Sequence, residues 1–139
     1  MIVIWLAALV FVPLKHWKNS WPIGIFGMVC IYAIDGTLVY LGAFRFWGEG
    51  IYISGIPLCY CIGYFPGGIL FDHFRSHEYI KRPLYILITA AVLLAMELIM
   101  AYFGYFQHLS WNAYRAYLLN AGGFTILMWL SEWMEQGRN

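Results

Sequence analysis

Two carboxylic acids lie deep inside apolar stretches of the sequence, and these are the residues whose chemistry stands out most. Asp35 falls within residues 22–44 and Glu97 within residues 83–106, and no lysine, arginine or histidine lies at the same depth. Ionisable groups inside a membrane-spanning segment are costly and are a functional hypothesis by default. At about 1.5 Å per residue, each acid lies roughly 20 Å from the start of its stretch.

Asn120 is expected at the same level from a helix that runs the other way. It lies nine residues past Trp111, which places it about 13 Å from the opposite face of an apolar layer about 30 Å thick. A buried carboxyl without a basic neighbour favours its neutral form, and two facing carboxyls can share one proton. The layer of Asp35, Glu97 and Asn120 is therefore a candidate proton site, ion site or polar ligand pocket. The alternatives are a hydrogen-bonded cluster that only fixes helix packing and a catalytic centre.

The elements that must position these residues are predicted to be membrane helices. Of the 139 residues, 63% are hydrophobic, 20% aromatic and only 11% charged. A soluble domain carries about 45–50% apolar and about 25% charged residues. So few charges cannot cover a water-exposed surface, so lipid is expected to solvate much of the chain. Backbone groups in lipid must be satisfied within the segment, which favours helices.

The predicted fold is a single all-α membrane bundle with five transmembrane helices. The third segment is irregular because it contains Pro57 and Pro66, and proline in a helix interior removes a hydrogen bond and bends the helix. Pro22 and Pro83 are expected at helix starts, where a missing N–H does no harm. The five predicted spans are residues 1–17, 22–44, 51–74, 83–106 and 111–133.

Basic residues predict the orientation, because cytoplasmic loops carry an excess of lysine and arginine. The first apolar run precedes its basic residues, an order opposite to that of a signal peptide. With five crossings, the N-terminus is expected outside and the C-terminus in the cytoplasm. We expect Arg75, Lys81 and Arg82 to contact anionic lipid head groups. Six basic residues fall on the predicted cytoplasmic side and two on the other: Lys15, Lys18, Arg75, Lys81, Arg82 and Arg138 against Arg45 and Arg115.

No motif for a cofactor, a metal or nucleic acid is present. The net charge is +1, and aromatic residues without a basic patch do not favour nucleic acid. His73 and His77 would share a face if a helix continued through them, but solvated loop residues are the favoured interpretation. Three cysteines without framework spacing are interpreted as packing residues.

Several short stretches resemble an uncharacterised family of small multipass membrane proteins of Bacillus- and Clostridium-like spore-forming bacteria. The resemblance implies a bacterial inner-membrane location and no particular chemistry. The stretches are Pro13-Leu14-Lys15, Trp21-Pro22, Ile53-Ser54-Gly55-Ile56-Pro57, Phe65-Pro66-Gly67-Gly68 and the tail from Tyr117 to Trp133.

The predicted function is a small membrane module that binds a ligand, an ion or a partner helix through Asp35, Glu97 and Asn120. Such a module would act as a sensor or an accessory subunit, with the bilayer, a second copy or a membrane protein as partner. The alternative is a proton- or cation-coupled transporter or channel. A lipid-modifying enzyme that uses the same acids is a third option, so enzymatic activity stays open.

Overall fold

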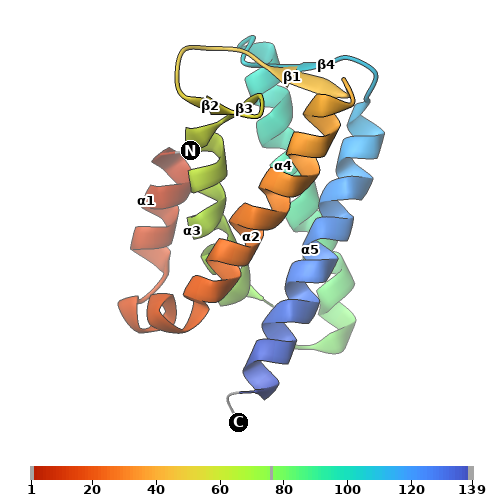
Figure 1. Cartoon of the computed structure of the whole chain (residues 1–139). Coiled ribbons are helices and arrows are strands. Elements are labelled where there is room, and N and C mark those ends of the chain that lie inside the picture. Colours follow the sequence, from red (N-terminus) through yellow and green to blue (C-terminus); the bar gives the residue numbers. More distant parts are fainter. Residues whose placement is uncertain (1, 76, 138–139) are drawn as a thin grey trace.

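Five α-helices run alternately down and up in the computed structural model, which describes residues 2–75 and 77–137. In Figure 1, the first helix begins near the upper end, where the strands lie, and the fifth helix ends at the lower end. The prediction of an all-α architecture is confirmed for this part of the chain. The helices are α1 (Ile2–Phe11), α2 (Leu14–Tyr40), α3 (Leu58–Phe74), α4 (Arg82–Tyr102) and α5 (Ala113–Gln136).

The most extensive helix contact among the described residues joins α2 to α3, and glycine makes it possible. A Cβ atom on Gly68 would lie 3.0 Å from the Ile23 carbonyl oxygen, and one on Gly24 would lie 2.8 Å from the Phe65 carbonyl oxygen. Small residues allow helix backbones to approach each other in this way. The other main contacts pair α4 with α5 and α1 with α3.

Short strands close the upper end of the bundle, where the sequence predicted only helices and loops. Strand β1 (Phe44–Phe46) pairs antiparallel with β4 (Phe106–His108), so that Phe44 lies opposite His108. This pair links the loop after α2 to the loop between α4 and α5 (Figure 1).

A second strand pair precedes α3. Strands β2 (Tyr52–Ile53) and β3 (Ile56–Pro57) form a hairpin around Ser54 and Gly55. Both turn residues have positive φ, at 52° and 83°, as a two-residue type I′ turn requires. The Tyr32 hydroxyl lies 3.0 Å from Ser54 Oγ and fastens the hairpin to α2.

The helix lengths differ from the predicted spans. Two helical segments, Leu14–Tyr40 and Tyr79–Tyr102, are long and apolar enough to cross a membrane; the second includes the 3₁₀ turn Tyr79–Lys81. Helices α1 and α3 have 10 and 17 residues, whereas a span normally needs about 20. The predicted first span shrinks because α1 ends at Phe11 and residues 14–17 belong to α2; Met1 lies outside the described residues.

The prolines also lie differently from their predicted places. Pro57 does not kink a helix: it pairs with Tyr52 in the hairpin and immediately precedes α3. Its missing N–H costs nothing there. Pro66 lies inside α3, as predicted. Pro22, predicted at a helix start, lies inside α2, and in Figure 1 the first turns of α2 run along the lower edge before the helix rises.

Candidate functional site

The predicted polar layer converges on one cavity below the strands. Asp35 comes from α2, Glu97 from α4 and Asn120 from α5, and all three line this cavity. They are 5%, 7% and 8% exposed, so none of them faces the surroundings of the bundle. Asn120 Nδ2 donates a hydrogen bond to Glu97 Oε1 over 3.2 Å. The structure therefore brings together the three residues that the sequence placed at one level.

Aromatic side chains close the cavity from above. Phe44 and Phe106, from the paired strands, line it together with Tyr60 of α3. The Tyr60 side chain is a hydrogen-bond partner of Asp35, and its hydroxyl lies 2.9 Å from that of Tyr64. The rings of Phe44 and Phe106 have centroids 5.0 Å apart. A small polar chamber thus lies under an aromatic cover.

The chamber is narrow. The space that the centre of a water-sized sphere can occupy is about 10 Å³. One buried water needs at least about 10–15 Å³ on this measure, together with two to four polar partners. The chamber therefore has room for about one water molecule and excludes an organic ligand.

Two further residues of the lining have polar atoms without a partner. His108 Nδ1, His108 Nε2 and Trp111 Nε1 are buried and make no hydrogen bond among the described residues. Burial lowers the pKa of His108 from its usual 6.5, so the imidazole is neutral at pH 7. Nearby, Asn112 caps α5 and accepts a hydrogen bond from the Arg115 N–H over 2.9 Å.

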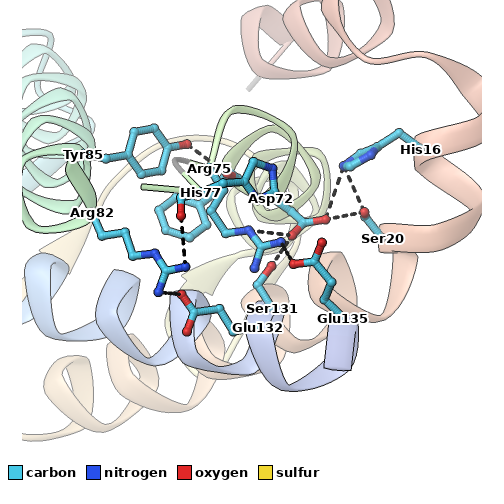
Figure 2. A network of polar contacts seen from close by, with 11 residues as sticks. His16, Ser20, Asp72, Arg75, His77, Arg82, Tyr85, Ser131, Glu132 and Glu135 are labelled. Atoms are coloured by element: carbon cyan, nitrogen blue, oxygen red, sulfur yellow. Dashed lines mark hydrogen bonds and ion pairs between the residues drawn. The ribbon is translucent and has the colours of Figure 1, made fainter. Parts of the chain in front are cut away.

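A second polar cluster, which we call the Asp72 network, joins α2, α3 and α5 near the lower end (Figure 2). Ser20 Oγ donates to Asp72 Oδ2 over 2.5 Å, and Ser131 Oγ donates to Asp72 Oδ1. His16 Nε2 lies 3.2 Å from Asp72 Oδ2. Three helices thereby converge on one carboxylate, both of whose oxygens accept hydrogen bonds.

Arginine side chains extend the Asp72 network. Arg75 Nε lies 3.8 Å from Asp72 Oδ1, and Arg75 Nη2 lies 2.6 Å from Glu135 Oε2. Arg82 Nη1 lies 2.5 Å from Glu132 Oε1. Two buried atoms of the network, Arg75 Nε and Glu132 Oε1, make no well-directed hydrogen bond. Each of them nevertheless belongs to an ion pair. Ion pairs between side chains of different helices are typical of a cluster that stabilises helix packing.

The predicted lipid contacts need one correction. Arg75 is 9% exposed and turns into the bundle toward Asp72 and Glu135, because a buried guanidinium needs anionic partners. It is therefore not available to head groups. Lys81 is exposed and lies 2.8 Å from Glu78, while Arg82 lies over the Tyr79 ring.

The residue types around Asp72 suggest a hydrolase triad, but the geometry does not provide one. A triad uses one histidine nitrogen to take the serine proton and the other to meet the carboxylate. Here the same atom, His16 Nε2, lies 3.0 Å from Ser20 Oγ and 3.2 Å from Asp72 Oδ2. Ser20 also donates its proton to Asp72, so its oxygen is not activated.

The histidine pair of the sequence does not share a helix face. Helix α3 ends at Phe74, so His77 lies beyond it; His73 packs against the His16 ring with centroids 4.9 Å apart. Within residues 2–75 and 77–137, no three histidine, cysteine, aspartate or glutamate side chains are placed to hold a metal ion.

Sequence reasoning missed the Asp72 network and the role of His108 in the chamber. Asp72 lies within the predicted span of residues 51–74, and α3 buries it. The presence of an aspartate inside an apolar span was the feature of the sequence that could have indicated this buried network. His108 carried no such signal, because the pairing of β1 with β4 decides where its ring lies.

Comparison of the chain with models of known protein families, with curated proteins and with solved structures finds no match.

Proposed function

We propose that this chain is a multipass membrane protein whose five helices all cross the bilayer. Large apolar side chains are exposed on the outward faces of the helices, where lipid would solvate them. Short helices such as α1 and α3 are accommodated when the bilayer thins locally around them. Examples of these exposed side chains are Leu6, Ile88, Val92, Leu118 and Trp129.

The proposed orientation is that of a bacterial inner-membrane protein with the lower end in the cytoplasm. The first turns of α2, at the lower end in Figure 1, contain Lys15 and Lys18, and the 3₁₀ turn before α4 contains Lys81. At the upper end, β1 contains Arg45 and the start of α5 contains Arg115. This asymmetry follows the positive-inside rule. Arg138, which the sequence assigns to the cytoplasmic side, lies outside the described residues. The resemblance to small membrane proteins of spore-forming bacteria supports the same location.

In this setting the chamber binds a proton together with one water molecule. The observation that carries the proposal is the convergence of Asp35 and Glu97, from two helices, on one closed space with Asn120. If both acids were ionised, their negative charges would repel each other in the chamber. The favoured state is therefore one in which the two acids share one proton through the water. The protein would then act as a proton-responsive sensor or accessory subunit.

The geometry disfavours the other occupants considered. An organic ligand or a lipid substrate does not fit a space for about one water. A partner helix cannot reach acids that are 5% and 7% exposed. Transport would need a second route toward the cytoplasm. On the cytoplasmic side of the acids, the buried residues Ile23, Phe71 and Leu127 form an apolar cluster, which disfavours such a route.

Infrared difference spectroscopy across a pH step tests the proposal, because it detects the C=O stretch of protonated carboxyls. We expect the protein in nanodiscs to show a band from a carboxyl shielded from bulk water. Asp35→Asn and Glu97→Gln should each remove or shift this band, because the two acids share the proton. Glu49→Gln, at an exposed position, is the matched control and should leave it unchanged.

A band that persists in both chamber variants would refute the proposal, as would its absence from the wild type. Proteoliposomes under a pH gradient address the transport alternative. We expect no proton flux above that of empty liposomes; a flux that Asp35→Asn abolishes would instead favour a transporter.

A further inference from the structure

His108 lies where the chamber meets the upper surface of the protein. It ends strand β4 and pairs with Phe44 of β1, and its ring packs edge-on against Phe106 with centroids 4.9 Å apart. The residue is partly exposed, yet both of its ring nitrogens are buried. Its exposure therefore belongs to other atoms, while the nitrogens turn inward.

The nitrogens of His108 have no protein partner, although a neutral imidazole carries one donor and one acceptor. Trp111 Nε1, a donor, is also buried and unpaired, and both residues line the chamber with Glu97 and Asn120. Buried polar groups are normally satisfied by protein or by ordered water. A water in the chamber would provide the missing partner.

On the opposite side of the acids, the cavity that runs from Asn120 to Leu127 is lined mainly by apolar side chains of the described residues. On α5, Leu127 and Met128 lie between Asn120 and Ser131, and both belong to the buried apolar cluster. The two polar clusters are thus separated by roughly 16 Å along this helix. An apolar segment of this length is a barrier to proton transfer, since each transfer needs a hydrogen-bonded partner.

We infer that His108 exchanges protons between the buried acids and the outer aqueous phase. This inference rests on the proposed proton site. Because both ring nitrogens are buried, uptake requires the ring to rotate toward the surface, where one nitrogen accepts a proton from outer water. After the ring turns back, the other nitrogen releases a proton to the chamber water. That water passes one proton to the carboxylate, and rotation of the ring or exchange of its tautomer restores the starting state.

The groups that face His108 suit such an exchange. The titratable groups of the lining are Asp35, Tyr60 and Glu97, which come from α2, α3 and α4. The nearest cation of α5 is Arg115, which lies over the Trp111 ring at 5.8 Å. A neutral histidine between water and an acid pair can take up and release protons near neutral pH.

The test is the rate at which the buried carboxyl band responds to a rapid pH step in nanodiscs. His108→Phe should slow the response at least tenfold when its rate is measured relative to the final amplitude of its own band. His108→Gln, which keeps polarity but cannot titrate, should slow it as well. His77→Phe, at an exposed histidine of the lower end, is the matched control and should respond as the wild type does. Imidazole added to His108→Ala should restore part of the rate.

The outcomes separate this inference from the proposed function. An unchanged rate in His108→Phe and His108→Gln, with the band present, would overturn the role of His108 and leave the proton site intact. Absence of the band from the wild type would refute the proton site itself. If His108→Phe does not fold, the rate in His108→Gln and the rescue by imidazole decide the question.

Discussion

The chamber and the Asp72 network are both buried and polar, but they differ in how their polar groups are satisfied. Asp72 accepts hydrogen bonds from Ser20 and Ser131 and lies beside His16 and Arg75. In the chamber, three polar atoms of His108 and Trp111 have no partner. Both oxygens of the Asp72 carboxylate are thus satisfied by protein groups, although the network borders a wider cavity. In the chamber, by contrast, unpartnered atoms surround a space for about one water.

This difference separates a structural role from a functional one. Hydrogen bonds and ion pairs between buried side chains specify how helices pack, and the Asp72 carboxylate joins three helices in this way. Buried polar groups left unpaired cost stability, so their retention around a cavity indicates an occupant. The comparison therefore favours helix assembly as the role of the lower cluster and supports the proposal that the upper one binds a proton.

The largest expected effect is the loss of stability in Asp72→Ala. The change leaves Arg75 with fewer anionic partners in a buried site and removes the acceptor of two serines. Breaking a buried charge pair costs about 3–5 kcal/mol. Equilibrium unfolding in mixed micelles measures the loss. Its control is Glu78→Ala, which removes an exposed carboxylate paired with Lys81 and should change stability by less than about 1 kcal/mol.

A smaller effect is expected for Ser131→Ala, which removes one donor to the Asp72 carboxylate. A hydrogen bond to a charged group contributes about 1.5–3 kcal/mol, and the same unfolding measurement applies. Ser110→Ala, which removes an exposed bond to the Gly42 carbonyl, should cost clearly less. Equal losses of unfolding free energy in the two variants would contradict the proposal that the Asp72 network stabilises helix packing more than an exposed hydrogen bond does.

Asp35→Asn should have a still smaller effect on stability. The amide has nearly the shape of the protonated acid and can still bond to Tyr60, so the free energy of unfolding should change by less than about 1.5 kcal/mol. A loss as large as that of Asp72→Ala would show that Asp35 also serves mainly to hold helices together, and the comparison would fail.

The smallest expected effect is a pH dependence that arises from His108. Burial lowers its pKa in the folded protein from the usual 6.5, so the unfolded chain binds more protons between those two values. Stability should therefore fall as pH decreases through 6.5 toward the lowered pKa. His108→Phe should flatten this part of the stability curve; an unchanged curve would show that the buried imidazole does not contribute.

The sequence predicted the chamber because depth along a helix follows directly from residue number. Asp35, Glu97 and Asn120 needed only a rise per residue and alternating helix directions. The prediction did not require the exact helix ends, which were wrong for several segments. All three residues meet because their helices pack side by side.

The strands and the Asp72 network could not be predicted in this way. The pairing of β1 with β4 joins residues about 60 positions apart, and three residues are too few for a visible alternation. Ser20 and Ser131 are neutral, and nothing in the sequence indicates that both donate hydrogen bonds to Asp72. The sequence predicts a kink at Pro57 because an apolar hairpin and an apolar helix have similar compositions.

The most direct test of the comparison is an experimental structure at a resolution that shows ordered water. We predict a water molecule in the chamber within hydrogen-bonding distance of Glu97 or Asp35 and of a His108 nitrogen, and none between Asp72 and its two serines. A dry chamber, with His108 bonded to protein groups alone, would contradict the account.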